Sequence, residues 1–439
     1  MKFFFIQTFG CQQNYSDSER IKSILEEYNY KQIKNIKEAD IIIFNTCSVR
    51  QKSEDKAIGY ILNAHRLRDK KPRLIGLTGC MARKTSTKFS QDKDSLLKKN
   101  GLLDFVFRIE DTPSLPNLLK GQDISSSCIG ENTENLFQIK PSPMSVNGFV
   151  PIMTGCNKFC SYCIVPYTRG REKSRPIQNI LNDCKFLVDR GISEIMLLGQ
   201  NVNAYYINDQ DRKNRKNQTD FAYLLDQVAQ IKGIKRIRYT SPHPSQMSLD
   251  VIDVMSKHEN ICNHIHLPVQ SGSSEILKKM NRSHTREDFE KITAYARKKI
   301  PNIAISTDLI VGFPSETEDQ FKESKALCEQ EKFDMIYAAQ FSPRKGTTAY
   351  KMPDNVPQKE KKRRFHEIQE ILKKSALEKN QRFLGKITEV LIETIEDGLC
   401  TGKNQEFKQV HFKSNKKIGE YAKIKIDEVN QWFLKGEEV

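Results

Sequence analysis

Three cysteines in one short stretch have the residue type and spacing that most clearly indicate a chemically active site. Cys156, Cys160 and Cys163, here called the barrel cysteines, follow a C-x3-C-x2-C pattern. Three thiolates leave a tetrahedral zinc shell one ligand short. A four-iron cluster held by three thiolates instead keeps one iron open for another ligand. The spacing therefore favours a [4Fe-4S] cluster with an open iron. Three unrelated cysteines, or a zinc site completed from elsewhere, are the alternatives.

A second set of three cysteines is spread along the first part of the chain. Cys11, Cys47 and Cys80, here called the N-terminal cysteines, each stand a few residues after an apolar run. These runs are predicted to be β-strands, at Lys2–Gln7, Asp40–Phe44 and Arg73–Leu77. Because the carboxyl ends of parallel strands line one crevice, we expect the three thiols to converge. A second [4Fe-4S] cluster would fit them, with zinc or buried structural cysteines as alternatives.

The remaining cysteines show no ligand spacing. The chain holds eleven cysteines in all, and without an export signal we do not expect disulfides. Two of the remaining cysteines, Cys184 and Cys328, fall on apolar helix faces and are expected to fill the core. No role is assigned to Cys128, Cys184, Cys262, Cys328 and Cys400.

Residues 1–120 are predicted to form a βα domain that positions the N-terminal cysteines. The three strands alternate with amphipathic segments at Ser18–Tyr28 and Ser53–Leu67, which indicates a parallel sheet. Gly101–Leu119 adds a further strand and helix. Residues 121–147 carry Ser, Asn, Pro and Gly with little periodicity, so we expect a linker there.

Residues 148–373 continue the alternation of strands and helices, which predicts a partial (β/α)6 barrel. On such folds the working residues sit at the carboxyl ends of the strands, and the barrel cysteines follow the first strand. The six strands are predicted at Val150–Thr154, Glu194–Leu198, Arg236–Thr240, His264–Val269, Ile303–Ile310 and Met335–Phe341.

Residues 374–438 change to short alternating strands with Gly turns, which predicts a small β-barrel. Its strands are expected at Lys386–Ile392, Gln409–Phe412 and Tyr421–Ile426, after a basic helix at Gln358–Lys374. The predicted fold class is therefore α/β, with an N-terminal parallel-sheet domain, a central partial (β/α)6 barrel and a small C-terminal β-barrel.

The charge of the chain points to a polyanionic partner. The 439 residues carry a net charge of +16, which is typical of proteins that meet nucleic acid. A lysine-rich proteome would give the same balance without such a partner. No apolar run is long enough to cross a membrane, and Phe3–Ile6 is too short for a signal sequence. We therefore expect a cytoplasmic protein without a membrane partner.

The barrel cysteines, placed after a barrel strand, resemble the mark of the radical S-adenosylmethionine (SAM) enzymes. The resemblance implies that the open iron chelates the amino and carboxylate groups of SAM. It also implies that an electron from the cluster cleaves SAM to a 5′-deoxyadenosyl radical, while the protein supplies positioning. The barrel cysteines would then be the catalytic, radical-generating set.

Two three-cysteine sites followed by a β-domain resemble, over nearly the whole chain, the methylthiotransferases among these enzymes. The terminal β-domain resembles a TRAM module, a small RNA-binding barrel. The motifs that carry the resemblance are Cys163–Gly170, Leu198–Asn203, Thr240–Pro244, His266–Gly272, Met280–Arg282 and Ser306–Pro314.

This resemblance implies a transferase that adds a methylthio group to C2 of N6-isopentenyladenosine beside the tRNA anticodon. It implies one [4Fe-4S] cluster on the N-terminal cysteines, a second, SAM-binding one on the barrel cysteines, and two SAM per turnover. The implied partners are the tRNA anticodon arm, a flavodoxin-like electron donor and an unidentified sulfur donor. Threonylcarbamoyl-adenosine and a ribosomal-protein aspartate are alternative substrates. A non-enzymatic RNA-binding protein with zinc at both sites is the alternative of another class.

Polar residues at or beyond the barrel strand ends are candidates for contacts with SAM. Amides and hydroxyls there can hydrogen-bond the ribose, adenine or methionine part, and a glycine lets backbone approach a ligand. A loop-capping or turn role is the alternative for each. The candidates are Gln200, Asn201, Ser241, Gln270 and Gly312.

The C-terminal barrel is the candidate RNA-binding surface. Residues 398–425 hold seven Lys against two Glu. Aromatic residues lie among them, at Phe407, His411, Phe412 and Tyr421. A basic surface with aromatics can contact phosphates and stack exposed bases, as readers of single-stranded RNA do. The basic helix at Gln358–Lys374 would add charge if it flanks the same opening. A solvated lysine face is the alternative.

Overall fold

The computed structural model describes residues 2–48, 51–69, 71–85, 101–120, 139–207 and 218–439. The chain divides into two compact units. The first comprises residues 1–144 together with 163–171, and the second comprises 145–162 together with 172–439. Among the described helices, none has the length and apolar character needed to cross a membrane. Most of the predicted linker, residues 121–138, lies outside the described residues.

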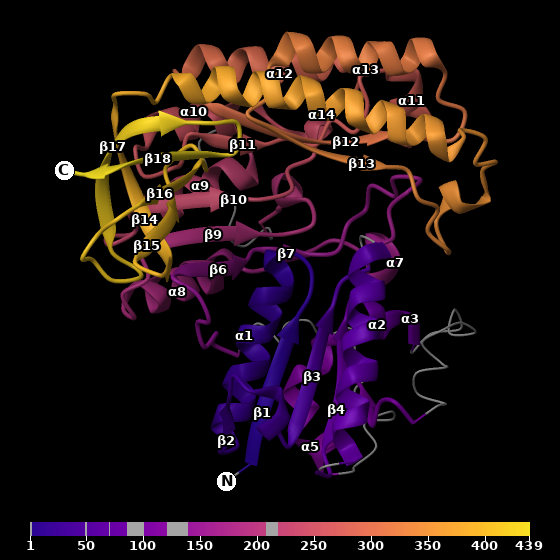
Figure 1. Cartoon of the computed structure of the whole chain (residues 1–439), viewed down its shortest axis with the longest axis vertical. Helices are drawn as coiled ribbons and strands as arrows, with labels where there is room; N and C mark the ends of the chain where they lie inside the picture. Colours follow the sequence, from indigo (N-terminus) through magenta and orange to yellow (C-terminus); the bar gives the residue numbers. More distant parts are fainter. Residues whose placement is uncertain (1, 49–50, 70, 86–100, 121–138, 208–217) are drawn as a thin grey trace. The chain divides into compact units, whose positions relative to one another are not determined.

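The first unit is built on a five-stranded parallel sheet of order β2-β1-β3-β4-β5. Figure 1 shows the three longest strands running side by side. The strands are β1 (Lys2–Thr8), β2 (Tyr30–Gln32), β3 (Ile41–Thr46), β4 (Leu74–Gly79) and β5 (Phe105–Val106). The helices are α1 (Gln12–Glu27), η1 (Ile36–Glu38), α2 (Gln51–Arg66), η2 (Leu67–Asp69), α3 (Cys80–Thr85), η3 (Ile109–Ser114), α5 (Leu115–Leu119) and α7 (Val165–Thr168).

Two apolar layers hold this sheet, one on each face. One layer packs α1 and α5 against Phe4, Ile6 and Ile41, and the other packs α2 against Ile42 and Phe44. All six residues of the central strand β3 are buried, as expected for a parallel sheet covered on both faces. The parallel-sheet domain predicted from the sequence is confirmed.

Helix α1 begins six residues before the predicted Ser18–Tyr28 segment, at Gln12. The apolar pattern used for the prediction does not extend there. The first turns of the helix bury polar side chains instead, among them Gln13, Asn14 and Asp17. Hydrophobic periodicity cannot find a helix face that is buried but polar.

The second unit contains the predicted six parallel strands, in chain order. Strands β6-β9-β10 and β11-β12-β13 form two three-stranded sheets, joined by a parallel bridge between Ile237 and Ile261. The predicted partial barrel is thereby confirmed. Its strands are β6 (Asn147–Pro151), β9 (Glu194–Leu198), β10 (Arg236–Tyr239), β11 (His264–His266), β12 (Ala304–Val311) and β13 (Met335–Gln340), with a short antiparallel pair β7 (Met153–Thr154) and β8 (Lys173–Ser174).

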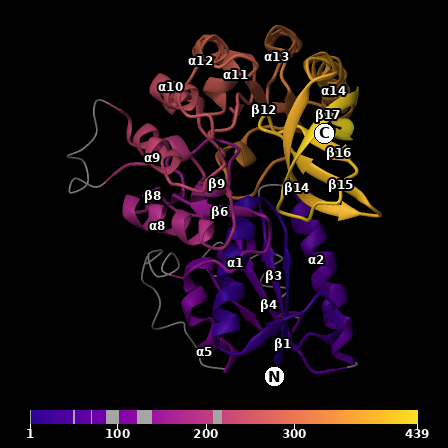
Figure 2. The same ribbon diagram turned by 90° about the vertical axis from the view of Figure 1, so that its left-hand side faces the viewer.

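Helices cover the outer side of this partial barrel. Figure 2 shows α10, α12, α13 and α14 in an arc around the strands. Their apolar faces join the strands in one large core. The helices are α8 (Ile177–Val188), η4 (Val202–Ala204), α9 (Asp220–Ala229), η6 (Pro244–Gln246), α10 (Leu249–Lys257), α11 (Ser274–Lys279), α12 (Arg286–Lys299), α13 (Glu318–Glu331), η7 (Thr348–Lys351) and α14 (Gln358–Gln381).

The C-terminal strands close into the predicted small barrel, of order β14-β15-β16-β18-β17. The sequence pattern found three of the five strands and missed β15 and β18. Both are short and contain a glycine, Gly402 or Gly436, which interrupts the apolar alternation. The strands are β14 (Ile387–Glu396), β15 (Leu399–Lys403), β16 (Gln409–Phe412), β17 (Tyr421–Val429) and β18 (Phe433–Glu438).

The small barrel is docked on the amino ends of the parallel strands through Phe407. Its ring stacks on His264, with centroids 5.0 Å apart, and contacts an apolar cluster containing Phe149 and Met196. The Arg238 guanidinium lies 4.9 Å from the ring centroid. Burial and then the Arg238 charge hold the pKa of His264 well below its usual value. The stacked imidazole is therefore neutral at pH 7.

Replacing Phe407 with Ala is expected to weaken this docking by about 2–4 kcal/mol, since aromatic burial, ring stacking and a cation–π contact are lost together. Calorimetry should then show the small barrel melting earlier than in the parent protein. Leu399→Ala is the control, because Leu399 lies on the same barrel and is 40% exposed. Equal melting of both variants and the parent would contradict the docking role.

Candidate functional site

The N-terminal cysteines lie at the carboxyl ends of three neighbouring strands. Cys11 follows β1 and caps α1, while Cys47 and Cys80 follow Thr46 and Gly79, which are register partners on β3 and β4. Gly10 places its backbone against Cys47, because a Cβ built on Gly10 would lie 2.5 Å from the Cys47 Cβ. The topology thus brings the three residues to one edge of the sheet, as the sequence predicts.

Two asparagines tie the cysteine-bearing loops together. The Asn14 amide donates to the Asn45 Oδ1 at 3.0 Å and to the Thr46 carbonyl at 3.1 Å. The Asn45 amide donates back to the Asn14 carbonyl at 2.7 Å. The Asn14 Oδ1 also accepts from the Cys11 thiol at 3.5 Å. Because both side chains are fully buried, this network fixes the spacing of the loops.

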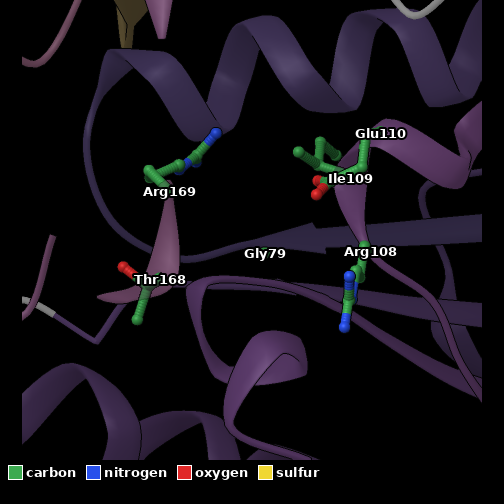
Figure 3. Close-up of a pocket in the computed structure, with 6 residues that line it drawn as sticks. All are labelled: Gly79, Arg108, Ile109, Glu110, Thr168 and Arg169. Atoms are coloured by element: carbon green, nitrogen blue, oxygen red, sulfur yellow. The ribbon is translucent and has the colours of Figure 1, made fainter. Parts of the chain in front are cut away.

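An arginine from the segment after the barrel cysteines completes this part of the first unit. Arg169 follows α7, and its Nη2 donates to the Asp17 carboxylate at 2.8 Å. A pocket of about 10 Å³ lies beside it, lined by Gly79, Arg108 and Thr168 among others. Figure 3 shows the Arg169 and Arg108 side chains extending in opposite directions from this pocket.

The donor chemistry of the N-terminal cysteines suits an iron–sulfur cluster. Three thiols at one sheet edge are soft ligands of the kind that hold iron–sulfur clusters. In the described ranges, no three His, Cys, Asp or Glu side chains already form a metal-binding group. The strand ends that lead into Cys47 and Cys80 are neighbours, since Thr46 and Gly79 are register partners.

The loop that carries the barrel cysteines is braced by the Met280–Arg282 motif. The Met280 carbonyl accepts from Ser161 N–H at 2.9 Å, and the Asn281 amide donates to the Phe159 carbonyl at 2.9 Å. The Arg282 Nη1 donates to the Cys160 Sγ at 3.6 Å. Cys156 and Cys160 belong to the second unit, whereas Cys163 begins the segment that belongs to the first.

Burial controls the protonation of the groups around this loop. It raises the pKa of Cys156 to about 11. Burial, and then the Arg282 charge, lower the pKa of His243 to about 2 and that of His284 to about 3. These two imidazole rings, whose centroids are 5.6 Å apart, are therefore neutral at pH 7 and offer polar atoms without charge.

Two of the candidate SAM contacts, Gln200 and Asn201, hold loops beside the barrel cysteines. The Gln200 Oε1 accepts from Gly155 N–H at 2.6 Å, immediately before Cys156. The Asn201 amide donates to Glu172 at 3.1 Å and to Gln246 at 2.7 Å. The Asn201 Oδ1 is buried without a hydrogen-bond partner in the described part of the chain. This oxygen is the candidate atom best placed to receive a ligand.

The other three candidates, Ser241, Gln270 and Gly312, share a left-handed backbone. Their φ values are +59°, +75° and +69°. Gln270 exchanges backbone hydrogen bonds with strand β12, and a Cβ on Gly312 would lie 2.4 Å from the Lys361 Cγ. The close approach of the Lys361 side chain thus accounts for a glycine at position 312 without a ligand. Strained backbone at Ser241 and Gln270 is typical of functional sites.

The aromatic residues predicted to stack on RNA bases are used in packing instead. Phe407 stacks on His264, and Phe412 is 1% exposed. The Tyr421 ring centroid lies 4.9 Å from the Arg236 guanidinium carbon, and the His411 ring packs edge-on against the Phe433 ring. The prediction that these rings stack bases is therefore wrong for Phe407 and Phe412. The sequence could not show which face of each strand turns inward.

The basic helix α14 also carries less free charge than its composition suggests. Arg363 pairs with acidic residues that include Glu318, and Arg364 is buried against Glu316 at 2.8 Å. Lys361 pairs with Asp354 at 2.6 Å and is buried as well. These cations fix the helix to its neighbours and do not form a free phosphate-binding surface.

Three family models match the chain. "Uncharacterized protein family UPF0004" matches residues 3–106, "Radical SAM superfamily" matches 150–328, and "TRAM domain" matches 381–439. The N-terminal cysteines fall within the first match and the barrel cysteines within the second. The resemblance to radical SAM methylthiotransferases is confirmed by these matches and the relatives below.

Curated relatives match almost the whole chain. A tRNA-2-methylthio-N(6)-dimethylallyladenosine synthase of Thermoanaerobacter sp. (strain X514) is 40% identical over 99% of this chain and 92% of its own length. Proteins of the same name from Clostridium botulinum (strain Langeland) and Clostridium tetani are 40% identical over 99% of this chain, and cover 97% and 96% of their own lengths.

Among solved structures, the chain resembles a radical SAM methyltransferase, TsrM, from Kitasatospora setae. The structure with cobalamin and a [4Fe-4S] cluster bound matches with a TM-score of 0.54 at 12% identity, over 77% of this chain and 75% of that one. The cobalamin-dependent enzyme OxsB in its apo form matches with a TM-score of 0.53 at 11% identity. The match covers 84% of this chain and 56% of that one. At this identity the likeness concerns the fold alone.

Proposed function

Since the chain belongs to the family of tRNA-2-methylthio-N6-dimethylallyladenosine synthases, radical SAM proteins with a TRAM domain, we propose that it methylthiolates C2 of N6-isopentenyladenosine beside the tRNA anticodon. The observation that carries this is the pair of three-cysteine sets within a full-length match to these relatives. The alternative substrates would need the same chemistry but another way of recognising the target.

We assign one role to each of the three predicted domains. Residues 1–120 would hold the first [4Fe-4S] cluster on Cys11, Cys47 and Cys80. Residues 148–373 would hold the second on the barrel cysteines and bind SAM. Residues 374–438 would bind the tRNA anticodon arm. We place the protein in the cytoplasm, with a flavodoxin-like protein as electron donor and a sulfur donor still to be identified.

The cofactors, when bound, supply the radical that takes hydrogen from C2 and the methylthio group that replaces it. The residues of this chain bind and orient. Arg282 places a positive charge at Cys160, and Asn281 fixes the backbone of the cysteine loop. Asn201 offers an unpartnered oxygen to a SAM hydroxyl or amino group. No acid–base pair is required of the protein.

Mass spectrometry of tRNA nucleosides tests the proposal. The gene is expressed in a bacterial host that makes isopentenyladenosine but lacks its own methylthiolation. We expect 2-methylthio-isopentenyladenosine to appear with this gene and to be absent with the empty vector. The protein purified without oxygen should be brown, with broad absorption at about 400 nm, as iron–sulfur proteins are.

Three results would overturn the proposal. A methylthio group on threonylcarbamoyl-adenosine, with isopentenyladenosine unchanged, would assign the first alternative substrate. A methylthio group on a ribosomal-protein aspartate would assign the second. A colourless protein that binds zinc, with both nucleosides unchanged in a host that loads other clusters normally, would indicate the non-enzymatic RNA-binding protein.

A further inference from the structure

Arg169 joins the barrel-cysteine motif to the N-terminal cysteine site. It lies six residues after Cys163 in sequence, yet the segment 163–171 belongs to the first unit. Within that unit, α7 packs against α3, the helix that begins with Cys80. The arginine side chain is 6% exposed and its Asp17 partner 2% exposed. A residue of the radical SAM motif is thus built into the interior of the N-terminal domain.

The charge neighbours of Arg169 are the carboxylate of Asp17 and the thiols of Cys80 and Cys11. Burial alone would lower the pKa of Arg169, but the interaction with these three groups outweighs it and raises the pKa. Burial raises the pKa of the Cys11 thiol, and the positive charge of Arg169 partly offsets this rise. The geometry agrees with this: Arg169 lines the same pocket as Gly79, the residue before Cys80, and it pairs with Asp17 on α1, the helix that Cys11 caps.

A purely structural role does not explain this arrangement well. A buried ion pair contributes little net stability, because both charges lose their hydration. Asp17 already accepts from the Gln13 amide at 3.2 Å and sits on the polar face of α1 that borders the cysteine loops. A buried guanidinium that pairs with one carboxylate, beside the strand end that leads into Cys80, is an arrangement that suits additional negative charge.

We propose that Arg169 is a positioning residue of the N-terminal cluster, which places a fixed positive charge against the sulfurs of Cys11 and Cys80. The inference rests on the proposed function, because it requires the N-terminal cysteines to hold a [4Fe-4S] cluster. A cluster on three thiolates is anionic, and reduction adds one more negative charge. A buried positive charge beside it stabilises the reduced state and raises the reduction potential.

The test uses a background in which all three barrel cysteines are replaced by Ala, so that only the N-terminal site can hold iron. In this background we compare Arg169→Gln, Arg169→Lys and Asp17→Asn. The readouts are iron and sulfide content and the midpoint potential of the cluster, from a redox titration followed by electron paramagnetic resonance. Arg108→Gln is the matched control, since Arg108 lines the same pocket and points away from Arg169 (Figure 3).

We expect Arg169→Gln to shift the midpoint potential to more negative values. Arg169→Lys keeps the positive charge, so its midpoint potential should stay close to that of the parent. Asp17→Asn removes a negative charge, so it should not move the potential in that direction, although it breaks the same ion pair. Arg108→Gln should match the parent. If Arg169→Gln does not fold, Arg169→Met takes its place, because it also removes the charge and keeps a long side chain; the same shift to more negative values is expected.

Two failures are distinguishable. A background protein that holds no iron would contradict the N-terminal cluster itself, and with it the premise of the inference. An iron-loaded background whose potential is the same in the parent and the Arg169→Gln variant would overturn the role of Arg169 and leave the proposed function standing. Equal shifts from Arg169→Gln and Asp17→Asn would assign the pair a structural role only.

Discussion

A Cys156→Ala variant is expected to lose tRNA methylthiolation by more than about 100-fold, since even the outer partners of metal ligands cost 10–100-fold when they are replaced. Cys156, Cys160 and Cys163 are the three ligands that we propose for the SAM-binding cluster, so the set has no spare thiol. The same variant should no longer cleave SAM to 5′-deoxyadenosine in the presence of a strong reductant. Both products are measured by liquid chromatography and mass spectrometry.

A Cys47→Ala variant separates the two cysteine sets in this experiment. Cys47 follows β3 of the first unit, and Cys156 lies in the second. We therefore expect Cys47→Ala to retain SAM cleavage and to lose the methylthio product. Cys184→Ala is the control, because its thiol is fully buried in α8 and burial raises its pKa to about 12. Loss of SAM cleavage in Cys47→Ala would show that the sets are not independent.

The strand ends that position the cysteines could be predicted because they rest on local patterns. Five of the six barrel strands begin within one residue of their predicted starts, since buried parallel strands are continuous apolar runs. The first begins three residues earlier than predicted, at Asn147, and ends at Pro151, because Met153–Thr154 pairs with Lys173–Ser174 instead. A change of pairing partner within an apolar run leaves no signal in the hydrophobic pattern.

The charged residues beside the cysteines could not be predicted as partners. Arg169 and Arg282 both lie in motifs that the sequence singles out, yet nothing in the spacing relates Arg169 to Asp17, 152 residues away. Arg282 donates to the Cys160 thiol, and Arg169 pairs with Asp17 on the helix that Cys11 caps. Buried pairing is a property of the fold, and it is found only once distant strands and helices are in place.

Glu194 is the residue whose replacement should destabilise the second unit most. It begins β9, is 1% exposed, and accepts from the Arg238 Nε at 2.9 Å. Its other oxygen lies 3.7 Å from Arg236. Both arginines are buried and donate onward to the small barrel, Arg236 to the Lys403 carbonyl at 2.8 Å and Arg238 to that of Asn404 at 2.6 Å. Glu194 thus pairs with both buried cations, and Glu389 also lies 3.4 Å from Arg236.

A Glu194→Gln variant leaves Arg238 buried without its paired carboxylate, and leaves Arg236 with the half-exposed Glu389 at 3.4 Å. Breaking a buried pair in this way costs about 3–5 kcal/mol, which we expect as the loss in free energy of unfolding. Trp432, the one tryptophan of the chain, lies between β17 and β18 and reports the unfolding of the small barrel in urea by its fluorescence.

The matched control for this effect is Glu428→Gln. Glu428 pairs with Lys435 on the small barrel, and both side chains are more than half exposed, so the midpoint should hardly change. A Glu194→Gln midpoint equal to that of the control would mean that the carbonyls of the small barrel alone stabilise Arg236 and Arg238. A lower midpoint with an unchanged urea dependence would instead identify Glu194 as the main counter-charge of the two arginines that join the small barrel to the parallel strands.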